Sequence, residues 1–294
     1  MKKALLFIYI AFFGFLTHPS AGAAAGQRAT VQPSTTRPTD VAAHSADSIP
    51  LMNGHHPYTV ANTHSHNDYE QATPFWLAYG QQFGSIEADI WWVGGKMLIG
   101  HNTEEIKSGR TLDEYYLKPL LSCILKNNGH PYADTARQLS MLIDVKTDSI
   151  ATLDALMDLL KKYPLLVNTA SIRWVISGRR PVPSLFISYP SFISFDGVLH
   201  SDYSPEALTK IVMMSDDLHY YTHWNGLTTI PAADLPALQQ AITRSHGLQK
   251  PVRFWDAPDF PQAWSQLIKL QVDYLNTDHI RQLADFLRSG AIPE

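Results

Sequence analysis

Residues 141–176 read MLIDVKTDSIATLDALMDLLKKYPLLVNTASIRWVI, and this stretch contains the strand–helix–strand pattern that decides the fold. The apolar runs at 141–145 and 172–176 have the length and composition of buried strands. Between them, residues 150–162 carry apolar side chains at the spacing of an amphipathic helix. Strands that alternate with helices in this way predict a parallel sheet.

The same alternation continues on both sides of this unit. Further strands are predicted at residues 58–62, 85–90, 193–198, 218–223, 252–255 and 273–275. Further helices are predicted at residues 74–82, 112–126, 205–213, 232–244, 260–269 and 279–288. Such a chain suits a single (β/α)8 barrel of the TIM type better than a doubly wound sheet, because these barrels have about 250 residues. Residues 179–192 contain several prolines and no clear helix, so one unit of the barrel is expected to be irregular.

The bulk composition is that of a globular domain. The chain has 294 residues, of which 45% are hydrophobic and 17% charged, and its formal net charge is −4. This balance supplies ample material for a core and gives no general attraction to nucleic acid. Cys123 is the only cysteine, so no intrachain disulfide can form.

Two segments before residue 57 are predicted to lie outside the barrel. Lys2 and Lys3 precede an apolar run that ends at Leu16, and small residues follow at 21–25, which is the pattern of a secretory signal at residues 1–25. An uncleaved anchor is the alternative, although the run is shorter than the about 20 residues of a membrane span. Residues 26–56 have the composition of a flexible linker, which leaves 57–294 for the barrel. We therefore expect an exported bacterial protein, either periplasmic or secreted.

Acidic residues stand at the ends of two predicted strands, where the active sites of such barrels gather. Glu87 and Asp89 are two positions apart, so their side chains share one face of a strand, and Asp144 and Lys146 share a face in the same way. Burying neighbouring carboxylates is costly unless a cation joins them, and Mg²⁺ and Ca²⁺ prefer oxygen ligands. The spacing predicts a metal site at Glu87 and Asp89 that Asp144 can complete. Lys146 can then hold a phosphate oxygen.

Two histidines follow short predicted strands. His66 lies in the string HSHNDY at 64–69, and His101 follows Gly100. Each polar cluster alone has a simpler interpretation, such as a solvated acidic face, a buried salt bridge or a structural histidine. Their ordered recurrence at successive strand ends favours a functional site.

This ordered set resembles the signature of the phosphatidylinositol-phospholipase-C-like phosphodiesterase superfamily, which includes glycerophosphodiester phosphodiesterases and sphingomyelinase D. The motifs that carry the resemblance are His66, Glu87-x-Asp89, Gly100-His101 and Asp144-x-Lys146. Residues 64–69, 110–112, 177–181, 253–255 and 275–278 are similar to a branch that includes proteins like the yeast altered inheritance of mitochondria protein 6. The resemblance covers about residues 58 to 288, which is nearly the whole predicted barrel.

The resemblance implies a two-histidine mechanism around one divalent cation, Mg²⁺ or Ca²⁺. The implied site residues are His66 and His101 as general base and acid, Glu87, Asp89 and Asp144 as metal ligands, and Lys146, Arg253 and Trp255 as substrate-binding residues. For Trp255, packing in the barrel core is the alternative. The implied substrate is a small-molecule or lipid-derived phosphodiester, and a lipid would entail transient membrane contact. Attack by water and attack by a substrate hydroxyl, which gives a cyclic phosphate, both stay open. No protein partner is implied.

The sequence departs from the glycerophosphodiester phosphodiesterases at three places. Those enzymes usually carry His-Arg-Gly at the first histidine, whereas His66 is followed by Asn67-Asp68. They usually carry His-Asp at the second, whereas here His101 precedes Asn102, and they often have a glutamate where this chain has Asp144. These departures put the glycerol-containing substrate in doubt but leave the catalytic set complete.

Two other functions fit parts of the sequence. The His64-x-His66 pair also suits a zinc hydrolase of the amidohydrolase or polymerase-and-histidinol-phosphatase type. Its further ligands would come from His200, His219, His223 and Asp278. That interpretation leaves Glu87, Asp89 and Lys146 without a role. A non-catalytic binding protein on the same barrel is the other alternative, because fold does not dictate function.

Overall fold

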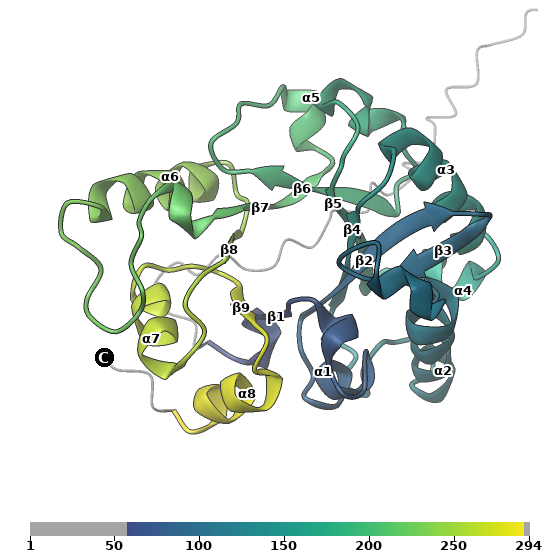
Figure 1. Cartoon of the computed structure of the whole chain (residues 1–294), viewed down its shortest axis with the longest axis horizontal. Helices are drawn as coiled ribbons and strands as arrows, with labels where there is room; N and C mark the ends of the chain where they lie inside the picture. Colours follow the sequence, from purple (N-terminus) through teal and green to yellow (C-terminus); the bar gives the residue numbers. More distant parts are fainter. Residues whose placement is uncertain (1–57, 291–294) are drawn as a thin grey trace, which may run out of the picture. The chain divides into compact units, whose positions relative to one another are not determined.

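Eight parallel strands form the centre of residues 58–290, the part of the chain that the computed structural model describes (Figure 1). In their order around the sheet they are β8 (Val252–Trp255), β7 (Ile211–Asp217), β6 (Ile193–Val198), β5 (Ile172–Gly178), β4 (Leu139–Val145), β2 (Ser85–Val93), β1 (Thr63–Ser65) and β9 (Leu275–Thr277). A parallel bridge between Arg253 and Tyr274 joins the two ends of this order, so the sheet closes into a barrel. The predicted (β/α)8 barrel is confirmed. The additional strand β3 (Lys96–Ile99) pairs antiparallel with β2 and forms a hairpin.

Helices surround the strands (Figure 1). They are α1 (Trp76–Gly80), α2 (Lys118–Lys126), α3 (Ser149–Leu160), α4 (Pro164–Asn168), α5 (Pro205–Leu208), α6 (Leu235–Gly247), α7 (Pro261–Lys269) and α8 (Ile280–Arg288). Short 3₁₀ turns lie at η1 (Val60–Asn62), η2 (Asp68–Glu70), η3 (Glu105–Ser108), η5 (Pro183–Ser188) and η6 (Leu218–Tyr220), and η4 (Asp113–Leu117) is a π-helical turn. No helix within 58–290 is long and apolar enough to cross a membrane.

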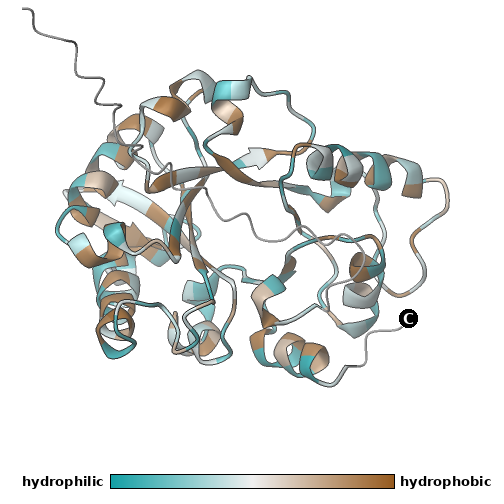
Figure 2. Ribbon diagram, turned by 180° about the vertical axis from the view of Figure 1, so that it is seen from behind, coloured by the Kyte–Doolittle hydropathy of each residue, from teal (hydrophilic) through white to brown (hydrophobic). Residues whose placement is uncertain are grey.

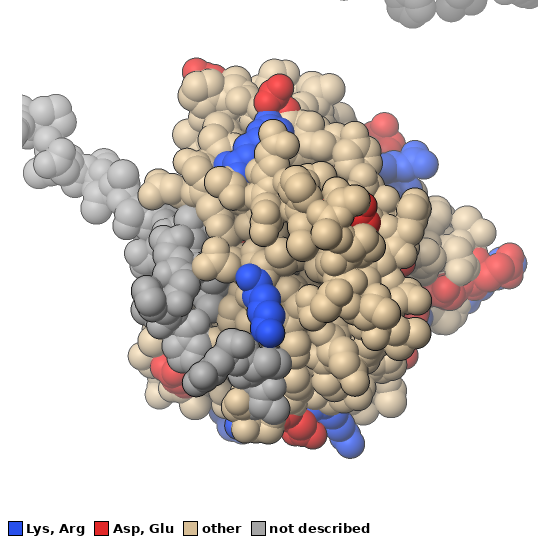
Figure 3. All heavy atoms as spheres, turned by 90° about the vertical axis from the view of Figure 1, so that its left-hand side faces the viewer, with Lys and Arg blue, Asp and Glu red and all other residues tan. Residues whose placement is uncertain are grey.

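Two apolar regions stabilise the barrel. The larger lies between the sheet and the helices, and Figure 2 shows apolar residues concentrated along the central strands. In α8, for example, Ile280, Leu283, Ala284 and Leu287 recur at helical spacing and are all buried. The smaller region lies inside the barrel and consists of Leu142, Val175, Met213 and Tyr274. On the face that Figure 3 presents, positive and negative side chains lie in small mixed groups and form no extended patch of one sign.

Two barrel strands, β1 and β7, differ from the predicted ranges. Residues 60–62 form η1, because the Thr59 side chain accepts a hydrogen bond from the Ala61 backbone N–H, and the strand begins only at Thr63. The strand predicted at 218–223 is wrong, since β7 occupies Ile211–Asp217, partly within the range predicted as a helix. The helix that begins at Pro205 ends after four residues at Leu208, and the Asp217 carboxylate accepts from the His219 N–H and starts a 3₁₀ turn.

The irregular unit is confirmed between β5 and β6. The connection there contains the 3₁₀ turn η5 instead of an α-helix. The predicted signal at 1–25 and linker at 26–56 lie outside the described residues.

The buried Asp68 carboxylate organises the loop that follows β1. It accepts hydrogen bonds from the Ser65 hydroxyl (2.8 Å), the Tyr116 hydroxyl (3.0 Å) and the Phe75 backbone N–H. We expect Asp68→Ala to lower the free energy of unfolding by about 3 kcal/mol, because three buried donors would lose their acceptor. Urea denaturation measures this change. Asp134→Ala is the control, since Asp134 is exposed and accepts only from a local N–H, and equal losses in the two variants would contradict the prediction.

Candidate active site

Three carboxylates meet where β2 pairs with the C-terminal half of β4. Glu87 and Asp89 project from β2 on the same face, and Asp89 pairs in register with Asp144 of β4. One oxygen of each carboxylate lies within 4.8 Å of the corresponding oxygens of the other two. The structure therefore brings together the three metal ligands that the sequence predicts.

The hydrogen bonding of this cluster fits a hard divalent cation. Asp89 Oδ1 and Asp144 Oδ1 are buried and have no hydrogen-bond partner in the part of the chain that the structure describes. Burial, together with the negative charge of Glu87, raises the pKa of both aspartates. Unpaired buried carboxylate oxygens are costly, and a cation with oxygen ligands such as Mg²⁺ or Ca²⁺ would remove that cost.

Lys146 follows β4 and lies against the same carboxylates. Its Nζ is 2.8 Å from Asp89 Oδ2 and 3.3 Å from Asp144 Oδ2. Burial lowers the pKa of Lys146, but the neighbouring aspartates outweigh it, so the net shift is upward and the amine stays charged. The side chain is 21% exposed, so its charge lies at the edge of the cluster that faces solvent.

His101 enters the site from the loop after β3. Its Nδ1 lies 3.3 Å from Asp89 Oδ2, and the imidazole is 55% exposed. Two contacts hold the loop in place: Trp91 Nε1 donates to the Gly100 carbonyl at 2.7 Å, and the His101 N–H donates to Glu105 at 2.9 Å. The ring is therefore fixed beside the carboxylates but open to solvent.

His66 follows β1 and pairs with Asp278. Its Nδ1 lies 2.9 Å from Asp278 Oδ1, and its backbone N–H donates to the Thr277 carbonyl at 3.0 Å. Desolvation lowers the pKa of His66, but the hydrogen bond to Asp278 and the charges of Glu87 and Asp278 outweigh it and raise the pKa overall. Asp278 thus orients the ring and stabilises its protonated form.

A buried polar layer lies inside the barrel beneath the site. His64 is fully buried, with Nδ1 2.8 Å from Ser85 Oγ and Nε2 2.9 Å from both Glu87 Oε2 and Arg253 Nη1. Burial and the charge of Arg253 lower the pKa of His64 to about 4, so the ring is neutral. Arg253 also contacts Asp196 at 3.3 Å and is only 3% exposed. Its predicted substrate contact stays a prediction, since its contacts here hold Glu87 and His64.

This layer argues against the zinc hydrolase. Both ring nitrogens of His64 are engaged, so His64 and His66 do not present a free pair of ligands. Among residues 58–290, two groups have metal-ligand geometry: the three carboxylates, and a set on the opposite side of the barrel mouth. The second set consists of Asp217, His219 and Asp256, and neither group contains two histidines.

Trp255 ends β8 and is 40% exposed, so it does not pack in the barrel core. Its predicted contact with substrate stays a prediction. Two contacts of the site were not predicted from the sequence. Asp278, which the sequence indicates only as a candidate zinc ligand, lies beside His66, and the Tyr69 hydroxyl donates to Asp89 at 2.8 Å. Both residues lie in the motif strings of the sequence, but only the fold shows what they contact.

Comparison with known proteins finds two family matches in this chain. An AIM6-like phosphodiesterase domain matches residues 57–165, and a glycerophosphoryl diester phosphodiesterase family matches residues 251–280. In these two segments, and over the length of the relatives described next, the chain is similar to the glycerophosphodiester phosphodiesterase and PI-PLC-like superfamily, including its AIM6-like branch. The resemblance predicted from the motifs is therefore confirmed.

The curated relatives are fungal. "Altered inheritance of mitochondria protein 6" of Eremothecium gossypii is 25% identical over 77% of this chain and 69% of its own length. The Lachancea thermotolerans protein is 25% identical over 76% and 65%, and the Arthroderma benhamiae homolog 24% over 74% and 81%. The matched region thus spans about two thirds of the length of the first two relatives. A crystal structure of a glycerophosphodiester phosphodiesterase from Parabacteroides distasonis has a TM-score of 0.49 at 15% identity, covering 78% of this chain and 98% of that chain.

The prediction of an exported bacterial protein is wrong. The relatives are fungal proteins named for mitochondrial inheritance, which points to a eukaryotic origin. The prediction depended on a basic start, a short apolar run and small residues. These are features of composition alone, and composition does not distinguish a bacterial export signal from a eukaryotic targeting segment.

Proposed function

We propose that this chain is a metal-dependent phosphodiesterase that works with Mg²⁺ or Ca²⁺ at Glu87, Asp89 and Asp144. The observation that carries the proposal is the pair of buried, unpaired oxygens on Asp89 and Asp144, beside which lies His101. A purely structural cluster would pair these oxygens with donors from the protein. In a site that binds a cation, these oxygens stay unpaired within the protein because they are the cation's ligands.

The proposed mechanism divides the work between two histidines. His66 takes a proton from the attacking water or substrate hydroxyl, and Asp278 stabilises the imidazolium that results. His101 gives a proton to the leaving oxygen, from a ring that is open to solvent. When bound, the cation supplies positive charge that polarises the phosphate. Lys146 adds a second positive charge for the phosphate oxygens.

The proposed substrate is a small-molecule or lipid-derived phosphodiester. Trp255 is partly exposed at the end of β8, where it offers an aromatic surface to a leaving group. Water and a neighbouring substrate hydroxyl are both compatible with His66 as the base. The products distinguish them, since a neighbouring hydroxyl gives a cyclic phosphate.

Metal removal tests the proposal. We expect EDTA to abolish hydrolysis of bis-(p-nitrophenyl) phosphate, and Mg²⁺ or Ca²⁺ to restore it, because the carboxylates repel one another and the phosphate without the cation. Asp144→Asn is expected to weaken binding of the restoring cation by about tenfold or more, because the site loses one charged ligand. Restoration by Zn²⁺ alone would contradict the carboxylate site. Absence of turnover with every metal and a glycerophosphodiester panel would favour the non-catalytic binding protein.

A further inference from the structure

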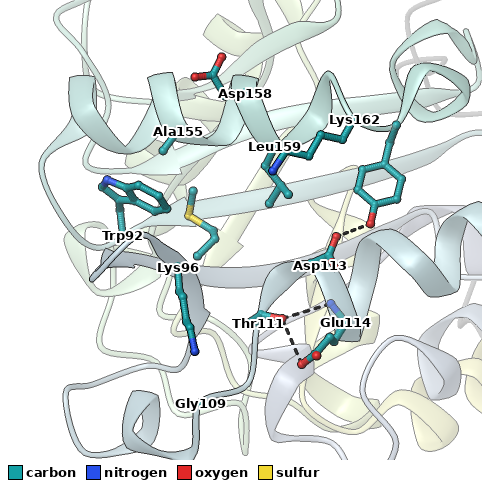
Figure 4. Close-up of a pocket in the computed structure, with 13 residues that line it drawn as sticks. Trp92, Lys96, Gly109, Thr111, Asp113, Glu114, Ala155, Asp158, Leu159 and Lys162 are labelled. Atoms are coloured by element: carbon teal, nitrogen blue, oxygen red, sulfur yellow. Dashed lines mark hydrogen bonds between the residues drawn. The ribbon is translucent and has the colours of Figure 1, made fainter.

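A cavity of about 750 Å³ lies on the outer side of the β2–β3 hairpin. Its walls come from the hairpin, η4 and the C-terminal half of α3 (Figure 4). Side chains alternate along a strand, so Trp92 in the wall points to the face opposite from Asp89. None of the lining residues belongs to the proposed catalytic set. The volume falls within the roughly 300–1,000 Å³ of small-molecule sites.

The floor of this cavity is apolar. Trp92 and Met97 come from the hairpin, and Ala155 and Leu159 come from α3. Met97 is 4% exposed, whereas Trp92 and Leu159 are partly exposed. An apolar ligand would therefore cover the indole and the leucine without displacing a hydrogen bond.

The acidic residues of the lining already have partners. Lys118 Nζ lies 2.7 Å from Asp113, and the Tyr163 hydroxyl donates to the same carboxylate. Burial by itself would raise the pKa of Asp113, but these hydrogen bonds and the charges of Lys118 and Lys162 lower it overall. Asp113 is thus an ionised carboxylate whose charge is already paired with a lysine.

Glu114 and Asp158 are engaged as well. Glu114 Oε2 accepts a hydrogen bond from Thr111 at 3.3 Å, at the edge of the cavity (Figure 4). Asp158 is paired with Lys161 at 2.9 Å, and its carboxylate points away from the cavity (Figure 4). Two of the three acidic groups are therefore charge-paired, and the charge of Glu114 alone is outnumbered by the two lysines of the lining.

The two lysines of the lining form no close ion pair in the described part of the chain, although the charge of Lys162 reaches Asp113. Neither Lys96 nor Lys162 forms a side-chain hydrogen bond or an ion pair with any residue in 58–290. The Lys162 side chain extends over Leu159, and Lys96 lies on the opposite wall toward Gly109 (Figure 4). The cavity thus combines an apolar floor with uncommitted ammonium groups on two sides.

We propose that this cavity binds an organic anion with an apolar, preferably aromatic, body. The body lies against Trp92 and Leu159, and the anionic group pairs with Lys162, with Lys96 adding charge from the other wall. An apolar surface alone would accept neutral ligands equally well. The unpaired ammonium groups therefore select the anion. This site is separate from the phosphodiesterase centre, so it stands or falls independently of the proposed function.

Titration of the full chain with 8-anilinonaphthalene-1-sulfonate tests the site, because this probe is an aromatic anion that fluoresces in apolar surroundings. We expect saturable binding that Lys162→Ala weakens by about tenfold, the loss of one charge-assisted contact, and that adding Lys96→Ala weakens further. Lys161→Ala is the matched control, since Lys161 is adjacent, exposed and paired with Asp158. Lys146→Ala is the second control, because it would detect binding at the phosphodiesterase centre.

The neutral probe N-phenyl-1-naphthylamine separates charge from apolar contact. Its affinity is expected to be lower than that of the sulfonate and to stay unchanged in Lys162→Ala. The proposal is overturned if the sulfonate does not bind saturably, or if the Lys96→Ala, Lys162→Ala double variant binds it unchanged. Equal losses in Lys161→Ala or Lys146→Ala would also overturn it. Circular dichroism confirms that each variant is folded before titration.

Discussion

Replacing His101 by glutamine is expected to lower kcat about 10²–10⁴-fold for a phosphodiester with an alkyl leaving group. An alkoxide is a poor leaving group, so it needs the proton that His101 supplies. A p-nitrophenolate leaves without a proton, so the same variant should lose much less activity on bis-(p-nitrophenyl) phosphate. Steady-state kinetics on the two substrates measures this difference.

His66→Gln should behave differently, because a general base acts on the nucleophile and not on the leaving group. Its loss is expected to be similar for both substrates. His130→Gln is the control, since His130 lies in the loop after α2 and contacts no proposed site residue. Reversed patterns in the two variants would exchange the roles of the histidines. Full activity of either variant on both substrates would refute the two-histidine mechanism.

Gly178→Ala is expected to lower activity about 100-fold and the free energy of unfolding by about 3 kcal/mol. Gly178 ends β5 with a φ of +65°, and a Cβ atom there would lie 1.9 Å from Asp144 Oδ1 and 2.7 Å from the Val145 carbonyl oxygen. The carboxylate of Asp144 must therefore shift from the position that it holds beside Glu87 and Asp89. Kinetics and urea denaturation measure the two effects.

Gly290→Ala separates backbone strain from this displacement. Gly290 has a φ of +67°, nearly the same, but a Cβ atom there would have nothing within 4 Å of it. Gly290→Ala should lower the free energy of unfolding by only about 1–2 kcal/mol, the strain of a non-glycine residue in the left-handed region, and leave activity unchanged. If Gly178→Ala acts through Asp144, combining it with Asp144→Ala adds no further loss of activity. An additive loss would show that Gly178 acts by another route.

The predicted part of the site is the part that depends on local spacing. Glu87 and Asp89 share a face because they are two residues apart on a strand, and Asp144 joins them because β4 pairs with β2 in register. The pairing of His66 with Asp278 could not be predicted in this way, since it depends on closure of the barrel between the first and last strands.

The missed elements share a physical cause. Residues 205–213 have a proline at their start and apolar side chains that fit a helix, and only pairing with β6 and β8 makes residues 211–217 a strand. The contact of His64 with Arg253 joins residues 189 positions apart, so no local pattern signals it. The exposed Trp255 similarly depends on where β8 ends relative to the barrel mouth.

The β2–β3 hairpin has a consequence for refolding. It carries Asp89 on one strand and His101 just beyond the other, and its register pairs Ile90 with Ile99. A slip of one residue would turn each β3 side chain to the opposite face and carry His101 away from Asp89. Such a molecule would retain the rest of the barrel. After dilution from urea, ellipticity should therefore recover before catalysis. At any time the difference between the two recovered fractions equals the fraction of chains whose hairpin has not yet reached the native register.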